Sequence, residues 1–152
     1  MCCRSYRALH FKKDMQVITD KTPLHSVYVV DEEGISKIFE ELKQVLASQV
    51  DCHTTLIYFS PENKFIFHRE LGILQNRYPT QFMLCPVSEN VIDASATLQE
   101  LLEAAINSNT KDRLIFIVSG DEELIDIASN HLWFLGIPKN QIKIYFLRQV
   151  KN

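Results

Sequence analysis

Residues 25–47 read HSVYVV-DEEG-ISKIFEELKQVLA, and residues 113–135 read RLIFIVSG-DEE-LIDIASNHLWFL. Each stretch begins with β-branched and aromatic residues, which are typical of a buried strand, and continues into an amphipathic helix pattern. An acidic triplet joins the two halves, at 31–33 in the first stretch and at 121–123 in the second. A strand that leads through a short polar turn into a helix is the repeating unit of helix-covered sheets. The two stretches therefore predict an α/β fold.

The remainder of the chain repeats this alternation. Strands are expected at 25–30, 54–59, 81–87, 113–118 and 141–147, and helices at 35–47, 65–77, 97–107 and 122–135. The strands are apolar on both faces, which indicates a parallel sheet that is covered on both sides. Right-handed crossovers then predict a doubly wound five-stranded parallel sheet of order 3-2-1-4-5 with helices on both faces. Its ligand crevice lies between strands 1 and 4, and both acidic turns border it.

Length and composition limit the possible number of domains, the kinds of partner and the cellular compartment. A chain of 152 residues predicts one domain, here 21–152, preceded by an N-terminal arm at 1–20. The net charge of -3 and scattered basic residues argue against a nucleic-acid partner, and no apolar run is long enough to span a membrane. Four irregularly spaced cysteines favour reduced thiols in a cytoplasmic protein, and the five histidines lack metal-ligand spacing.

Three turn segments carry a recognisable order of residues. The first strand is followed by Gly34-Ile35-Ser36, and the second by an aromatic residue, a polar turn and the segment FHREL at 67–71. The fourth strand ends in VSGD at 118–121, and its helix ends in LGIP at 135–138 before a last strand. From about residue 23 to residue 147, this order resembles the nicotinamide-nucleotide domain of the ferredoxin–NADP reductase family.

The resemblance implies a dinucleotide site but no catalytic residue in this chain. Its cofactor-binding residues would be Gly34 and Ile35 after strand 1, Ser119 and Gly120 after strand 4, and Ser60, Asn63 and Lys64 at the ribose end after strand 2. Glu62 disfavours a 2′-phosphate at that turn, so NAD is favoured over NADP. From the short segment upstream of the first strand, we expect no counterpart of the family's flavin-binding barrel. We therefore expect that this chain alone binds no flavin and that hydride transfer would require a separate flavoprotein partner.

The first turn departs from the family pattern. Asp31 and Glu32 stand where family members carry paired glycines, which let the backbone approach the pyrophosphate. At about 6 Å and an effective dielectric near 20, one pair of like charges repels by roughly 3 kcal/mol before screening by salt. The helix dipole returns only about 0.3–1 kcal/mol per charge. Repulsion is therefore expected to exceed attraction for a dinucleotide.

Two hypotheses for function follow, together with a purely structural alternative. The first is a stand-alone NAD(P)-binding module that binds a dinucleotide weakly and supports hydride transfer with a separate flavoprotein. The second is a non-catalytic interaction module that has lost the cofactor and presents its acidic crevice mouth to a basic protein partner. The structural alternative is that each acidic triplet is simply a good helix start, with aspartate as the N-cap.

Overall fold

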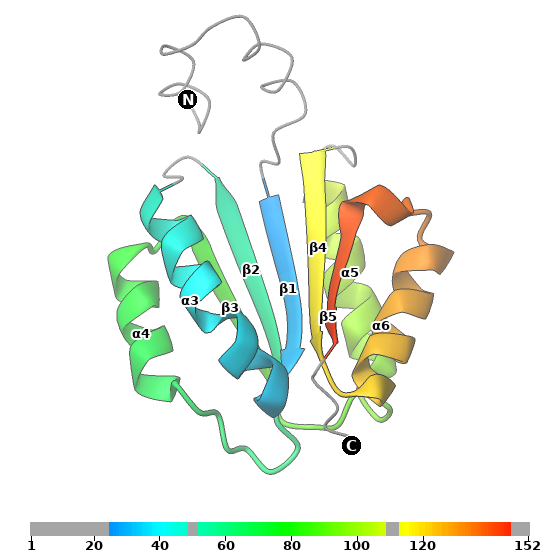
Figure 1. Cartoon of the computed structure of the whole chain (residues 1–152), viewed down its shortest axis with the longest axis horizontal. Helices are drawn as coiled ribbons and strands as arrows, with labels where there is room; N and C mark the ends of the chain where they lie inside the picture. Colours follow the sequence, from blue (N-terminus) through cyan, green and yellow to red (C-terminus); the bar gives the residue numbers. More distant parts are fainter. Residues whose placement is uncertain (1–24, 49–51, 109–112, 147–152) are drawn as a thin grey trace, which may run out of the picture.

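The computed structural model describes residues 25–48, 52–108 and 113–146. The elements are β1 (His25–Asp31), α3 (Glu32–Ser48), β2 (His53–Phe59), α4 (His68–Arg77), β3 (Phe82–Val87), α5 (Ser95–Ser108), β4 (Leu114–Gly120), α6 (Glu122–Phe134), the short 3₁₀ helix η2 (Lys139–Gln141) and β5 (Ile142–Phe146). Strands and helices alternate along the chain as the sequence predicts (Figure 1). The expected arm at 1–20 lies outside the described residues.

The five strands form one parallel sheet of order β3-β2-β1-β4-β5, so the predicted topology is confirmed. Two apolar cores lie on its opposite faces. One contains the buried residues of α5 and α6, and the other contains those of α3 and α4 (Figure 1). The central strand β1 is almost wholly buried because helices cover it on both sides. Because all five strands are parallel, their carboxyl ends meet at one edge of the sheet, where the acidic turns lie.

Hydrogen bonds between side chains fix α3 against the sheet. Glu41 of α3 accepts hydrogen bonds from the hydroxyl of Tyr28 on β1, at 3.0 Å, and from that of Tyr145 on β5, at 2.6 Å. The two phenols lie on the strands that flank β4, so one carboxylate ties the helix to both β1 and β5. The N-terminus of α3 is thereby held at the carboxyl edge of β1 and β4.

Two sequence expectations need correction. Helix α4 begins at His68 and not at 65, because Phe67 has a left-handed backbone (φ 64°) and the Tyr58 hydroxyl accepts the backbone N–H of Ile66. Four reduced thiols were also expected, but Cys52 is disulfide-bonded, while Cys85 on β3 is a free thiol. Neither difference changes the sheet or the position of the acidic turns.

Close packing between α3 and β4 depends on Gly34. A Cβ atom added to Gly34 would lie 1.7 Å from the carbonyl oxygen of Ser119 and 2.9 Å from the backbone nitrogen of Gly120. Both obstacles are backbone atoms, so they cannot move aside without displacing the strand. The absence of a side chain at Gly34 is therefore what allows the first turn of α3 to touch β4.

We expect Gly34→Ala to destabilise the protein by about 2–4 kcal/mol, because the added methyl group overlaps the backbone of β4. Gly72→Ala is the matched control, because a Cβ there meets nothing within 4 Å. Alanine should stabilise that helical site by roughly 0.5–1 kcal/mol. Urea unfolding of the two variants measures both effects, and equal stabilities would contradict the packing argument.

Candidate functional site

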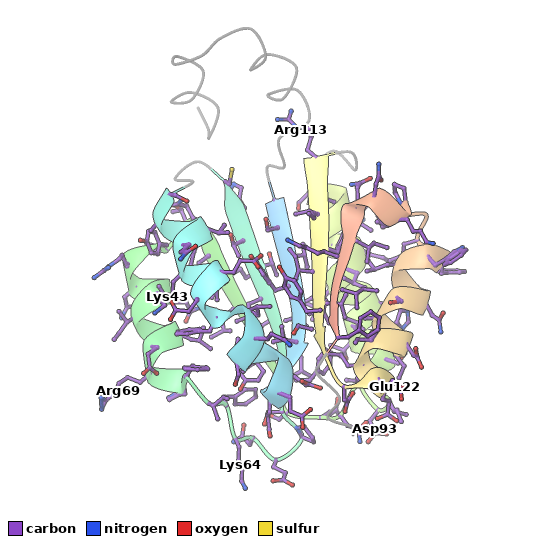
Figure 2. The ribbon with its side chains drawn as sticks, viewed as in Figure 1. Lys43, Lys64, Arg69, Asp93, Arg113 and Glu122 are labelled. Carbon is purple, nitrogen blue, oxygen red and sulfur yellow. The ribbon has the colours of Figure 1, made fainter. Side chains whose placement is uncertain are left out.

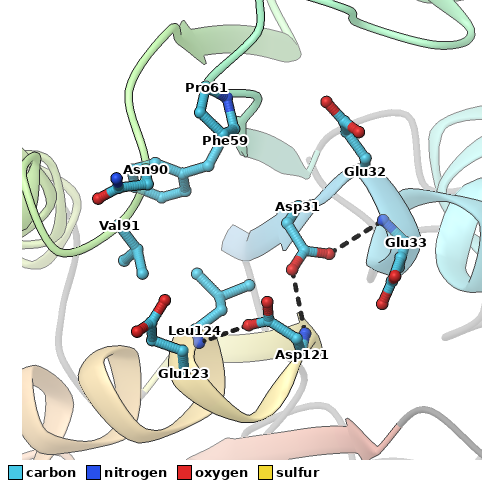
Figure 3. Close-up of a pocket in the computed structure, with 10 residues that line it drawn as sticks. All are labelled: Asp31, Glu32, Glu33, Phe59, Pro61, Asn90, Val91, Asp121, Glu123 and Leu124. Carbon is cyan, nitrogen blue, oxygen red and sulfur yellow. Dashed lines mark hydrogen bonds between the residues drawn. The ribbon is translucent and has the colours of Figure 1, made fainter.

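A cleft of about 190 Å³ opens at the carboxyl edge of the sheet, between the ends of β1 and β4 (Figure 3). Its walls come from the turns after four strands: Asp31, Glu32 and Glu33 after β1, Phe59 and Pro61 at the end of β2, Asn90 and Val91 after β3, and Asp121, Glu123 and Leu124 after β4. The sequence predicts the ligand crevice at this edge.

The carboxylate of Asp31 links the two acidic turns. Its Oδ1 accepts hydrogen bonds from the backbone N–H of Glu33, at 3.0 Å, and of Gly34, at 2.8 Å. Its Oδ2 accepts the N–H of Asp121 at 3.0 Å (Figure 3). Amides at the starts of both α3 and α6 thus donate to one side chain. These are the donors that a phosphate would use in a fold of this class.

Both aspartates cap helices, so the helix-start interpretation is confirmed. Asp121 has an extended backbone and its Oδ1 accepts the N–H of Leu124 at 2.9 Å, which is N-cap geometry. Asp31 does the same for α3, which consequently begins at Glu32, one turn before the expected start. The caps also hold both aspartates beside the cleft, so a structural role and a role at the cleft do not exclude each other.

The cleft has an apolar wall and a carboxylate rim. Phe59, Val91 and Leu124 belong to the apolar core between the sheet and α5/α6. Five carboxylates line the cleft, whereas Glu122, the sixth acid of the two triplets, does not. No lysine or arginine is among the described residues that line it. The cleft is therefore negatively charged when these groups are ionised.

Burial raises the pKa of the Asp31 carboxyl above its usual range. The hydrogen bonds from the amides of Asp121, Gly34 and Glu33 oppose this rise, and the nearby Asp121 carboxylate adds to it. Burial is the largest of these effects because Asp31 sits where two helices and two strands converge.

Four of the residues expected to bind cofactor, Gly34, Ile35, Ser119 and Gly120, cluster at the ends of β1 and β4, where they pack closely against one another and their neighbours. Ile35 is fully buried in the core under α3, and Ser119 is fully buried with its hydroxyl donating to the carbonyl of Gly34 at 3.2 Å. A Cβ on Gly120 would come within 2.7 Å of Oδ2 of Asp31. The Asp31 carboxylate and the Leu124 side chain thus both pack into the space left by Gly120.

The other three expected residues lie around the loop that follows β2. Ser60 is fully buried, donates to Oε2 of Glu32 at 2.6 Å and accepts the N–H of Lys64. Asn63 accepts from the hydroxyl of Ser88, and the Lys64 ammonium pairs with Glu62 at 3.2 Å. Figure 2 shows Lys64 extending outward from this loop. None of the seven expected residues is among the described residues that line the cleft.

Five cleft residues were not predicted from the sequence, namely Phe59, Pro61, Asn90, Val91 and Leu124. Asn90 and Val91 come from the loop after β3, which was read only as a polar connection. A usable signal was available, because in the predicted strand order the loop after strand 3 opens onto the same carboxyl edge. Phe59 is the last residue of β2, and its alternation along the strand assigns it to the α5/α6 face.

The described residues contain neither a side-chain cluster suited to a metal ion nor a helix suited to cross a membrane. No group of three or more His, Cys, Asp or Glu side chains within them is arranged to hold a metal ion. No helix in this part of the chain is long and apolar enough to cross a membrane.

Comparison with solved structures identifies the fold. No protein-family model and no curated protein sequence matches the chain. The ferredoxin–NADP⁺ reductase from Plasmodium falciparum matches with a TM-score of 0.66 at 17% identity, over 90% of this chain and 56% of the reductase. The reductase from Neisseria gonorrhoeae, with bound FAD and NADP, matches with a TM-score of 0.62 at 16% identity, over 82% and 56% of the two chains.

A flavohemoglobin from Malassezia yamatoensis, with bound FAD and heme, matches with a TM-score of 0.63 at 14% identity, over 84% of this chain and 32% of that protein. The chain thus spans little more than half the length of the reductases it matches, and a third of the flavohemoglobin. The expected resemblance is confirmed at the level of the fold, which is that of the NAD(P)-binding domain of ferredoxin–NADP reductases.

The raised pKa of Asp31 predicts a specific pH dependence of stability. A carboxyl whose pKa is higher in the folded than in the unfolded protein, where it is about 3.9, favours folding most when it is protonated. This contribution is complete below pH 3.9 and is lost as the pH rises through the folded pKa. The difference in unfolding free energy between the natural protein and Asp31→Asn should therefore fall between pH 3 and pH 7. Urea unfolding across this range measures it, and a rising difference would contradict the assignment.

Proposed function

We propose that this protein is a non-catalytic binding module that uses the reductase-type scaffold without holding a dinucleotide in the usual way. One observation carries the proposal: the Asp31 carboxylate accepts three backbone N–H groups, from the starts of both helices that border the cleft. In nucleotide-binding folds of this class these donors face the pyrophosphate. Here an internal anion already satisfies them.

Electrostatics supports the same conclusion. A pyrophosphate in the cleft would approach five carboxylates and no lysine or arginine among the described lining residues. Each carboxylate–phosphate pair at about 6 Å repels by roughly 3 kcal/mol before screening, whereas a helix dipole returns about 1 kcal/mol at most. Entry of the phosphate would also require displacement of Asp31 from its three hydrogen bonds. The cleft consequently disfavours the anion that the scaffold usually binds.

The same cleft has the features that a cationic side chain needs. Pro61 offers exposed apolar surface to an aliphatic stem, with the buried Phe59 and Leu124 behind it, and the surrounding carboxylates face its charged end. A lysine or arginine on a basic protein partner combines these two properties. The proposed role of the module is to dock such a partner at the carboxyl edge of the sheet.

The second candidate is weak binding of NAD or NADP, with hydride transfer to or from a separate flavoprotein. The observation that favours it is the fold match to reductases, one of which binds both FAD and NADP. The chemistry would belong to the two cofactors, since this chain offers no hydride acceptor of its own. Dinucleotide titration distinguishes the two candidates.

We expect titration calorimetry of the natural protein with NADH and with NADPH to give no heat of binding at millimolar ligand. The variant Asp31→Gly/Glu32→Gly frees the amide donors and removes two negative charges. It should bind a dinucleotide at least about tenfold more tightly, because each removed charge pair is worth about 1 kcal/mol after screening. Glycine is a tolerated N-cap, so α3 should remain folded.

Glu122→Gln/Asp126→Asn is the matched control, because it removes the same charge from exposed positions of α6 that do not line the cleft. Dinucleotide affinity should not change in this control. Submillimolar binding by the natural protein would refute the proposed role and support the weak dinucleotide module instead.

Tetralysine serves as a defined probe for the cationic partner. We expect it to shift the amide resonances of the two acidic turns in a heteronuclear NMR titration, with an affinity that falls steeply as salt is added. The variant Glu32→Gln/Glu33→Gln/Glu123→Gln leaves the caps intact. It should weaken binding by about tenfold, since three exposed ion pairs are worth roughly 0.5 kcal/mol each.

A control with Glu100→Gln/Glu122→Gln/Asp126→Asn removes three negative charges outside the cleft and should bind tetralysine almost as well as the natural protein. Equal weakening in both triple variants would mean that only net charge matters, and the cleft would then have no role in recognition.

A further inference from the structure

A second pocket lies on the opposite face of the sheet from the acidic cleft. It has a volume of about 220 Å³ and is lined by Tyr58, Phe65, His68, Leu71, Leu84 and Pro86. Tyr58, Leu71 and Leu84 belong to the core between the sheet and α3/α4, whereas Phe59, the next residue of β2, faces the acidic cleft. The two sites therefore share the end of β2 but open on different faces.

The lining of this pocket, here called the aromatic pocket, carries no charged carboxylate, lysine or arginine among the described residues. The Tyr58 hydroxyl is engaged, because it accepts the N–H of Ile66 at 3.0 Å and donates to its carbonyl at 3.4 Å. Burial raises the pKa of Tyr58 to about 12, so the phenol stays neutral. The imidazole of His68, an exposed residue, is the one lining side chain left to offer a polar contact to a ligand.

The loop between β2 and α4 holds the pocket open. The ring of Phe65 meets that of Tyr58 edge to face, at 5.0 Å and 89°, while the ring of Phe67 stacks on Phe39 at 4.1 Å. Phe67 and Asn63 are the non-glycine residues with positive φ in the described part of the chain, and both lie in this loop. The left-handed turn at Phe67 directs its ring to Phe39, so the ring does not fill the space beside Tyr58.

Volume and lining together define the ligand. An apolar cavity of about 150 Å³ is enough to bind benzene, so the larger pocket here accommodates a substituted or bicyclic ring. Its accessible apolar walls, Phe65, Leu84 and Pro86, lie over the buried Tyr58 and Leu71; they favour a planar apolar body and offer nothing to neutralise a charge. We propose that the aromatic pocket binds a small uncharged aromatic molecule of the size of indole, with His68 hydrogen-bonding its polar group.

Indole and toluene are the test probes, titrated into the full chain and followed by methyl NMR. Indole should give saturable shifts centred on the methyl groups of Leu71 and Leu84. Leu84→Phe should weaken indole binding by about tenfold or more, because the added ring atoms take up pocket volume. Ile73→Phe is the matched control: it adds the same ring at a half-exposed position of α4 and should leave binding unchanged.

His68→Ala keeps the test informative if Leu84→Phe fails to fold. It should weaken indole binding about three- to tenfold through loss of one hydrogen bond, and it should leave toluene binding unchanged. The proposal is overturned if indole at its solubility limit does not shift the Leu71 and Leu84 methyls, if Leu84→Phe and Ile73→Phe bind indole equally well, or if His68→Ala weakens toluene as much as indole.

Discussion

The structure at the carboxyl edge of the sheet depends on one carboxylate, that of Asp31, which accepts hydrogen bonds from three backbone amides. Asp31 ends the central strand, caps α3 and reaches across to the start of α6. The contact joins two strand–helix units that are separated by 90 residues along the chain. It does so at the place where a doubly wound fold normally leaves backbone donors open for a ligand. Stability and ligand binding therefore compete for the same N–H groups.

The two glycines next to this carboxylate show how the competition is resolved. Gly34 lets α3 approach the backbone of β4, and Gly120 leaves room for the oxygen of Asp31. In a dinucleotide-binding turn such glycines give access to a ligand's phosphates. In this protein Gly34 instead allows close packing of α3 on β4, and Gly120 leaves room for the Asp31 carboxylate. A retained glycine is consequently weak evidence for a retained cofactor unless the space beside it is open.

The two faces of the sheet present different chemistry close to one strand end. Phe59 lies on the wall of a cleft rimmed by carboxylates, while Tyr58 lines a pocket with aromatic and aliphatic walls. Alternation of side chains along β2 is the cause, because neighbouring residues point to opposite faces. A single strand terminus can therefore support a cationic contact on one face and an apolar ligand on the other, without either site requiring the other.

The sequence by itself determined the fold. Apolar strands alternate with amphipathic helices, and the handedness of crossovers leaves few arrangements, so strand order and the location of both acidic turns could be predicted. It also identified Asp31 and Asp121 as helix caps, because capping depends on a few neighbouring residues.

Tertiary structure alone decided what the candidate residues do. Ser60 and Ser119 are buried with bonded hydroxyls, Asn90 and Val91 reach the cleft from a distant loop, and Asp31 bonds to Asp121 across the sheet. Such contacts join segments far apart in the chain, so local residue patterns do not specify them; the predicted strand order indicates only that the loop after β3 opens onto the same edge.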